Sequence, residues 1–334
     1  MKLITECIRN KTTNINPVWL MRQAGRYLPE FREIRLKNQD FIKLCLNESL
    51  SSEITLQPIK RFDFDAAIIF SDILMLPYGL GQKVEFKKNF GPLLGDLDLP
   101  KLSQVDENTF VKKLIPVYDA IKNVKQNSLS KNKDVIGFVG APWTLLVYML
   151  NKQSPKKQLN NEILKDKKKV KDLFNLIDIF LKIHIKKQIE SGASVIQIFD
   201  SWAGLVDHND IDNYIYEPTI KLVDYVKTLN TPVICFPRNI NDYKNYVDVI
   251  KPDVINIDYN VDPVKIKNQL DIVVQGGMDP KILLKDKDEL KKEVLKFLNL
   301  FKDHPYIFNL GHGVLPETNP DSVDYMVKLI RDFK

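Results

Sequence analysis

The chain has 334 residues, of which 44% are hydrophobic and 28% charged, a composition typical of globular proteins. Its net charge of +6 comes mostly from dispersed lysines, so nucleic-acid binding is not expected. No stretch approaches the length of a membrane span, and the first residues lack the apolar run of a secretory signal. Cys7, Cys45 and Cys235 have no metal-ligand spacing, which predicts a reducing, cytoplasmic location without disulfides or bound metal.

The first informative element is the segment 21–35, which holds four of the eight arginines of the chain. Arg22 and Arg26 lie in an apolar context and would share one face if the segment is helical. Arginines in apolar sequence need anionic partners, and a guanidinium pairs with a carboxylate or phosphate through two parallel hydrogen bonds. The segment therefore predicts a polyanion-binding site, whereas surface ion pairs would account for Arg32 and Arg35.

Short β-branched, apolar runs that each stop at a polar or glycine cluster recur along the rest of the chain. They cover residues 66–70, 135–139, 194–199, 232–236, 254–257, 272–274 and 306–310, with helix-length segments between them. This alternation is typical of a parallel sheet buried on both faces. It favours a single-domain α/β fold over residues 1–334, a (β/α)8 TIM-type barrel whose eighth strand the pattern does not place; an open doubly wound sheet is the alternative.

The longer segments carry a helical period. The densest basic run, Lys165 to Lys171, begins one of them and is followed by an apolar stripe that includes Leu173, Ile177 and Leu181. We interpret these lysines as the solvated face of a helix rather than a nucleic-acid site.

In a barrel, the active site is built from residues that follow the carboxyl ends of the strands. Asp72 follows the first run among apolar residues, which suits either a functional carboxylate or a helix cap. His312 lies between two glycines after the last run, which favours a functional imidazole. Other strand ends hold Asp200, Ser201, Arg238 and Asp258.

Tyr148 lies on an expected helix that begins at Ala141 and Pro142. A buried phenol needs a hydrogen-bond partner, and a ligand carboxylate would serve; core packing is the alternative. The pair Gly276 and Gly277 could cradle a phosphate, but a tight turn explains it as well.

Five segments, in order along the chain, together resemble the uroporphyrinogen decarboxylase family of the haem pathway. They read PVWLMRQAGRYLPE from residue 17, FSDIL from residue 70, GAPWTL from residue 140, QIFDSWAG from residue 197 and NLGHG from residue 309. The similarity runs from near residue 17 to beyond residue 315, with no break at the positions that bind substrate in the family.

The resemblance implies a (β/α)8 barrel, a homodimer with facing active sites, and catalysis without a metal or organic cofactor. The implied reaction removes CO2 from the four acetate side chains of uroporphyrinogen III and gives coproporphyrinogen III. Carried over residue by residue, it implies Arg22, Arg26 and Asp72 as catalytic residues. The implied substrate-binding set is Arg22, Gln23, Ala24, Gly25, Arg26, Arg35, Asp72, Tyr148, Ser201 and His312.

The residues agree with this chemistry. A substrate with eight carboxylates explains arginines in apolar sequence, and a protonated pyrrole can accept the electrons of the breaking C–C bond without a separate electron sink. The protein must then supply a fixed anion beside the cation. Asp72 is expected to be the only strand-end carboxylate in a sufficiently apolar context. The proton donor stays open between His312 and a water or carboxyl held by an arginine.

Two other functions are compatible with parts of the sequence. A corrinoid-dependent methyltransferase of the wider superfamily would need zinc held by His and Cys, but Cys235 lies inside an expected strand and no His-x-Cys pair occurs. A non-catalytic tetrapyrrole carrier would keep the arginines but would not need Asp72 in its apolar setting.

Overall fold

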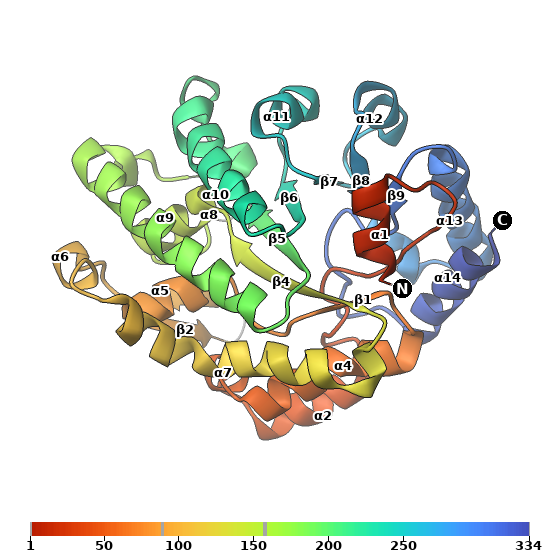
Figure 1. Cartoon of the computed structure of the whole chain (residues 1–334), viewed down its shortest axis with the longest axis horizontal. Coiled ribbons are helices and arrows are strands. Elements are labelled where there is room, and N and C mark those ends of the chain that lie inside the picture. The colour runs from red at the N-terminus through yellow and green to blue at the C-terminus, as the bar shows by residue number, and fades with distance from the viewer. Residues whose placement is uncertain (1, 88–89, 156–158, 334) are drawn as a thin grey trace.

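Seven parallel strands form one curled sheet at the centre of the molecule, in the order β1-β4-β5-β6-β7-β8-β9 (Figure 1). The computed structural model describes residues 2–87, 90–155 and 159–333. Within these residues the strands are β1 (Ala66–Ile68), β4 (Asp134–Gly140), β5 (Val195–Asp200), β6 (Val233–Pro237), β7 (Val254–Ile257), β8 (Val273–Gly276) and β9 (Tyr306–Ile307). All seven predicted runs are therefore confirmed as strands, although residues 308–310 contribute only isolated bridges, at Phe308 and Leu310.

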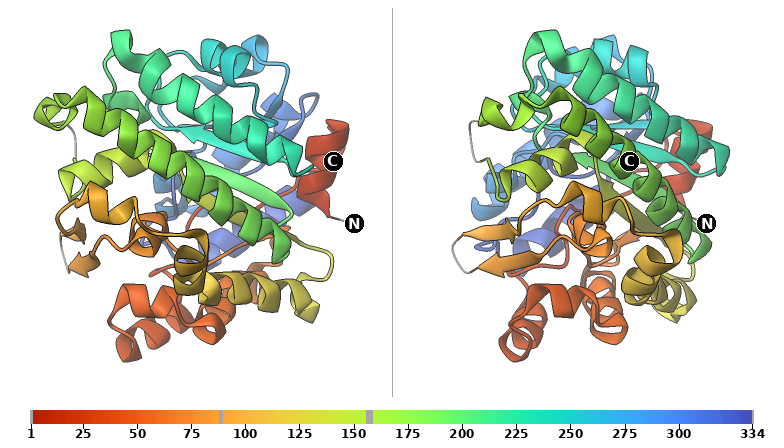
Figure 2. Two further views of the ribbon diagram at one scale, coloured as in Figure 1. Left: turned by 60° about the vertical axis from the view of Figure 1, so that its left-hand side comes forward. Right: turned by 90° about the vertical axis from the view of Figure 1, so that its left-hand side faces the viewer.

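Helices other than α1 cover the outside of the sheet (Figures 1 and 2). Before β1 lie α1 (Leu3–Asn10), α2 (Pro29–Lys37), α3 (Phe41–Cys45) and α4 (Glu48–Phe62). Between β1 and β5 lie α5 (Met75–Leu80), α6 (Leu99–Leu102), α7 (Glu107–Gln126), α8 (Pro142–Asn151) and α9 (Lys167–Glu190). After β5 come α10 (Glu217–Thr228), α11 (Tyr243–Ile250), α12 (Pro263–Gln269), α13 (Lys287–Phe301) and α14 (Pro320–Asp332).

Each strand of the sheet pairs with the next strand of that sheet along the chain, and every pairing is parallel. A doubly wound sheet reverses its strand order at a switch point, and this order has none. The doubly wound alternative is therefore wrong. An additional antiparallel hairpin, β2 (Val84–Lys87) with β3 (Gly91–Leu94), was not predicted.

The two faces of each strand belong to two different cores, which explains the continuous apolar runs. The inner core takes one residue or more from every strand of the sheet, and helix α1 adds Ile4, Cys7 and Ile8 to it. Figure 1 shows α1 beside β9. The strand residues of the inner core are Ala66, Ile136, Val195, Ile234, Phe236, Val254, Val273 and Ile307.

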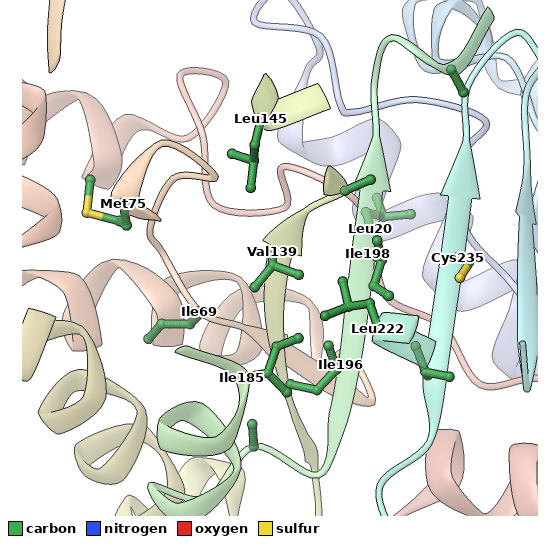
Figure 3. Packing of buried hydrophobic residues seen from close by; sticks show 14 of the residues in the cluster. Leu20, Ile69, Met75, Val139, Leu145, Ile185, Ile196, Ile198, Leu222 and Cys235 are labelled. Atoms are coloured by element: carbon green, nitrogen blue, oxygen red, sulfur yellow. The ribbon is translucent and has the colours of Figure 1, made fainter. Parts of the chain in front are cut away.

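The neighbouring residues along each strand point outward and pack against the helices. Figure 3 shows Val139 of β4 with Ile196 and Ile198 of β5, close to Ile185 of α9 and Leu222 of α10. Burial of apolar surface on both faces, at roughly 25 cal/mol per Å², is the main stabilising contribution to this layer.

Local signals in the sequence begin the helices. Asp106, Asp166 and Asp286 each accept a hydrogen bond from a backbone N–H of the helix that follows. Proline occupies the first turn of α8, α12 and α14, where its missing N–H costs nothing. As predicted, Leu173, Ile177 and Leu181 of α9 are buried.

The segment 17–19 lies between the two edge strands of the sheet and bonds to both sides. The Phe308 N–H donates to Pro17 O at 2.8 Å, and the Asp65 N–H donates to Val18 O at 2.9 Å. The Asp65 carboxylate accepts from the Val18 N–H at 2.7 Å and is itself held by both Nη atoms of Arg331 at 2.9 Å. These bonds fix the chain just before the arginine segment.

Candidate functional site

Residues 20–28 form turns, because α2 begins only at Pro29. The condition under which Arg22 and Arg26 would share one helical face is therefore not met. Arg22 itself has φ +60°, a left-handed conformation that is rare for a residue with a side chain. Such strained conformations persist where surrounding structure enforces them, and they cluster at functional sites.

Buried hydrogen bonds enforce this turn. Gln23 is fully buried; its Oε1 accepts from the Leu20 N–H at 3.1 Å and its Nε2 donates to Ala66 O at 3.0 Å. The Met21 N–H donates to Asn309 Oδ1 at 3.0 Å, and the Val314 N–H donates to Met21 O at 2.9 Å. Gln23 thus anchors the turn to β1, and both the oxygen and the nitrogen of its side-chain amide already have backbone partners.

Arg32 and Arg35 bond to backbone carbonyls rather than to acidic side chains. Arg32 Nη1 donates to the carbonyl oxygens of Arg26 and Tyr27. Arg35 Nη1 donates to Asn38 O at the end of α2, and its guanidinium lies 5.6 Å from the ring centre of Phe41. The surface ion pair in this region instead joins Arg61 to Glu30.

The Arg22 side chain reaches solvent, yet the surrounding protein desolvates its guanidinium and lowers the pKa. The positive charge of Arg238 lowers that pKa further, whereas the negative charge of Asp72 opposes the shift. The backbone of Gly313 lies directly under this side chain, where a Cβ would come within 2.7 Å of Arg22 Cγ. Gly313, next to His312, is therefore required because Arg22 approaches the loop after β9 so closely.

The two residues after Gln23 are small and close to the turn. Ala24 and Gly25 are half-buried. A Cβ on Gly25 would come 3.0 Å from Arg22 O, so a larger residue would press on the carbonyl beside the site. Arg26 has an exposed side chain, and its charge acts on Arg22.

Asp72 lies four residues beyond the end of β1 and is half-buried. Burial raises the pKa of its carboxyl to about 6, and the Leu74 N–H, at 2.8 Å from Oδ1, and the Arg22 charge only partly offset this. The alternative role as a helix cap is wrong, because the N-cap of α5 is Leu74; Asp72 Oδ1 instead supports the turn that leads into α5. The same carboxylate acts electrostatically on Arg22, so the position also serves the site.

Tyr148 and Ser201 are positioned by α8 and by the end of β5. Burial, followed by the charge of Asp72, raises the pKa of the Tyr148 phenol to about 12, so it stays protonated. Its ring meets that of Trp202 edge-on, with 5.8 Å between centroids. Ser201 is half-buried and directly precedes Trp202 in the chain.

His312 is half-buried, and its Nδ1 has no hydrogen-bond partner among the described residues. Burial lowers the pKa of the imidazole to about 3, and the positive charges of Arg238 and Arg22 add to the shift. The ring is therefore neutral at physiological pH. The other histidines serve elsewhere: His184, for example, is buried in α9 with its Nδ1 3.0 Å from Tyr118 Oη.

The tertiary structure thus places Arg26, Asp72, Tyr148 and His312 each within electrostatic reach of Arg22. The charge of Arg35 acts instead on the buried Cys45. It lowers the pKa of the Cys45 thiol, whereas the charge of Asp72 raises it.

Sequence reasoning was wrong that Asp72 is the only strand-end carboxylate in an apolar context. Asp200 and Asp258 are 2% and 1% exposed, and burial raises the pKa of Asp200 to about 7. Asp200 accepts from Thr144 Oγ1 at 2.6 Å, and its charge acts on Cys235 and Tyr246 rather than on the arginines. Of these two carboxylates and Asp72, it is Asp72 whose charge acts on both Arg22 and Tyr148.

The sequence placed Arg238 at a strand end but gave it no role in the site. It follows β6, and its Nε lies 3.6 Å from Asp258 Oδ1. Its charge is the largest electrostatic influence on both Arg22 and His312.

Burial raises the pKa of the Cys235 thiol to about 12. Over the described ranges, no group of three or more His, Cys, Asp or Glu side chains is arranged to hold a metal ion.

None of the helices in the described part of the chain combines the length and apolarity needed to cross a membrane.

Comparisons with known proteins show the family of the chain. Residues 1–333 match the family model described as uroporphyrinogen decarboxylase. Uroporphyrinogen decarboxylase from Rickettsia bellii is 40% identical over 340 residues, covering 100% of this chain and 99% of the relative, and that from Rickettsia felis is 39% identical over 342 residues, covering 99% and 97%. A methyltransferase from Methanosarcina mazei shares the fold, with a TM-score of 0.81 over 99% of this chain and 98% of its own, at 14% identity.

Proposed function

This chain belongs to the uroporphyrinogen decarboxylase family and is an enzyme of that class, and we propose how its site acts on uroporphyrinogen III. Arg22 and Arg26 pair with acetate and propionate groups of the substrate, because a guanidinium binds a carboxylate through two charge-assisted hydrogen bonds. Tyr148, Ser201 and His312 orient further carboxylates. Arg35 reaches a peripheral carboxylate, and Gln23, Ala24 and Gly25 complete the binding segment.

Asp72 stabilises the charged intermediate. Protonation of the ring carbon beside the acetate gives an iminium-like cation, and the electrons of the C–CO2 bond then flow into the ring. CO2 leaves behind an exocyclic methylene, which takes up a proton to form the methyl group as the ring carbon gives its proton back. An ionised Asp72 that accepts from the pyrrole N–H groups lowers the barrier, since it is fixed before the cation forms.

The observation that carries this proposal is the position of Arg22, whose side chain packs against Gly313 beside His312 and on whose guanidinium the charges of Asp72 and Arg238 both act. Several cations that act on one another suit a polyanionic substrate, and the Asp72 carboxylate beside them suits a cationic intermediate. Product binding alone, as in a tetrapyrrole carrier, would not need the raised pKa of Asp72.

Incubation with uroporphyrinogen under anaerobic conditions tests the function directly. We expect four CO2 per substrate and a product with four carboxylates. Binding without CO2 release would favour the carrier instead.

The segment 17–19 is proposed to complete a (β/α)8 barrel as its eighth strand within one domain spanning residues 1–334. Its hydrogen bonds to Phe308 on one side and to Asp65 on the other support this placement. Substitution of Val18 by Pro removes the N–H that bonds to Asp65, and should destabilise the fold by at least about 1–3 kcal/mol.

We also propose a cytoplasmic homodimer that does not bind nucleic acid. The basic run Lys165–Lys171 lies at the start of α9, outside the sheet, and the side chains of Lys165, Lys167, Lys168 and Lys171 are exposed, whereas that of Lys169 is half-buried. Sedimentation equilibrium should give twice the chain mass of 38.7 kDa.

A further inference from the structure

We propose that Arg238 is a third substrate-binding arginine, which reaches from the end of β6 to pair with a carboxylate of the substrate opposite Arg22 and is held ready by Asp258. This inference deepens the proposed function and rests on it. No sequence motif marks Arg238; the assignment comes from its place, its incomplete ion pair and the groups that it faces.

The backbone around Arg238 is fixed. Its N–H donates to Asp200 O at 3.0 Å, and its carbonyl accepts from the Gly204 N–H at 3.0 Å. The next residue, Asn239, has φ +57° and donates its N–H to Asp258 Oδ2. A guanidinium on such a rigid support loses little backbone freedom when it binds a ligand.

The ion pair with Asp258 leaves the side chain incompletely bonded. Arg238 Nε lies 3.6 Å from Asp258 Oδ1, and both atoms are buried without a hydrogen-bond partner among the described residues. The Arg238 side chain is 20% exposed, whereas that of Asp258 is 1% exposed. Asp258 therefore anchors the stem side of the guanidinium, and the solvent-facing part of the group remains able to bind an anion.

Arg238 belongs to the same constellation as the arginine segment, although β6 is not adjacent to β1 or β9. Its charge acts on Arg22 and on His312, so the curled sheet brings these groups together across the site. The two guanidiniums repel each other, and a substrate carboxylate between them would relieve that repulsion. A macrocycle with carboxylates around its whole rim suits arginines supplied from opposite sides.

Steady-state kinetics with uroporphyrinogen test the proposal. We expect Arg238→Gln to raise KM by about tenfold or more with a smaller change in kcat, because the lost contact holds a carboxylate remote from the reacting bond. Arg238→Lys should recover part of the loss, since it restores the charge but not the fork. Arg9→Gln, which alters an exposed arginine on α1, is the matched control and should leave KM unchanged.

Removal of Arg238 also leaves Asp258 buried and unpaired, which could unfold the protein. The double variant Arg238→Gln with Asp258→Asn removes both charges and separates the two effects. A stable double variant with a KM still raised about tenfold supports substrate binding. A double variant with wild-type KM would show that Arg238 only balances Asp258 and would overturn the proposal. Wild-type CO2 release, measured alongside, reports on the proposed function separately.

Discussion

The side chain of Arg22 packs so closely on Gly313 that a Cβ there would lie 2.7 Å from Arg22 Cγ, although the two residues are far apart in the sequence. This contact joins the arginine segment to the loop that carries His312. Hydrogen bonds from Met21 N–H to Asn309 Oδ1 and from Val314 N–H to Met21 O hold the two segments in register. The conformation of one arginine therefore depends on residues from both ends of the chain.

Gly313→Ala should displace the Arg22 side chain, because the added methyl would lie 2.7 Å from Cγ and 3.0 Å from Nε. We expect kcat/KM for uroporphyrinogen to fall by about ten- to a hundredfold while the fold is retained. The control is a double-mutant cycle with Arg22→Ala. In that background Gly313→Ala should cost little more; a full additional loss would show that the glycine acts independently of Arg22.

Arg22→Lys should lower kcat/KM by about tenfold or more, because an ammonium cannot form the two parallel bonds of a guanidinium. Lysine can follow the same backbone path, so thermal unfolding should stay close to that of the wild type. Arg9→Lys is a suitable comparison on the exposed face of α1. An unchanged rate for Arg22→Lys would mean that this arginine does not bind substrate.

Asp72→Asn should lose most turnover, by about a hundredfold or more, because the neutral amide cannot stabilise the cationic ring. The amide oxygen can still accept from the Leu74 N–H, so the turn before α5 should persist. CO2 release and substrate affinity, measured on the same preparation, check this expectation. Near-normal turnover would remove Asp72 from the mechanism.

The same variant should be more stable than the wild type at neutral pH. Burial raises the Asp72 pKa from 3.8 to about 6, so the ionised carboxylate destabilises the folded state, by up to about 3 kcal/mol. The penalty is fully present above pH 6 and disappears as both states become protonated toward pH 4. The difference in Tm between Asp72→Asn and wild type should therefore shrink as the pH falls; a constant difference would contradict the raised pKa.

His312 should be neutral in the free enzyme at any pH above about 5, because burial and the charges of Arg238 and Arg22 lower its pKa to about 3. Nitrogen-15 NMR can detect the protonation state of the imidazole. The signal that is missing from the His312→Gln variant assigns the His312 resonance. Binding of uroporphyrin, an oxidised octacarboxylate that cannot react, should raise this pKa because it adds negative charge. A His312 already protonated at pH 6 without ligand would contradict the electrostatics described above.

Much of the fold could be predicted because it rests on local, periodic signals. Runs such as 194–199 are apolar on both faces, and a strand of this kind can only lie between two cores. The helix starts at Asp106, Asp166 and Asp286 are likewise local, since a side chain bonds to a backbone N–H of the following turn. The relatives and the family match agree with the function that the arginine segment indicated.

The tertiary structure alone decided which charged residues lie near one another. The sequence distinguished Asp72 by its apolar context, but Asp200 and Asp258 are buried as well. What sets Asp72 apart is that its charge acts on Arg22 and Tyr148, whereas Asp258 pairs with Arg238. The left-handed turn at Arg22 could not be predicted from the sequence either. Besides Gln23, the residues that enforce it are Asn309 and Val314, which lie far away in the chain. Periodicity along a sequence specifies which surfaces are buried. The energy of a charge depends instead on its distance to other charges, and that distance is set only when strands and loops far apart in the chain come together.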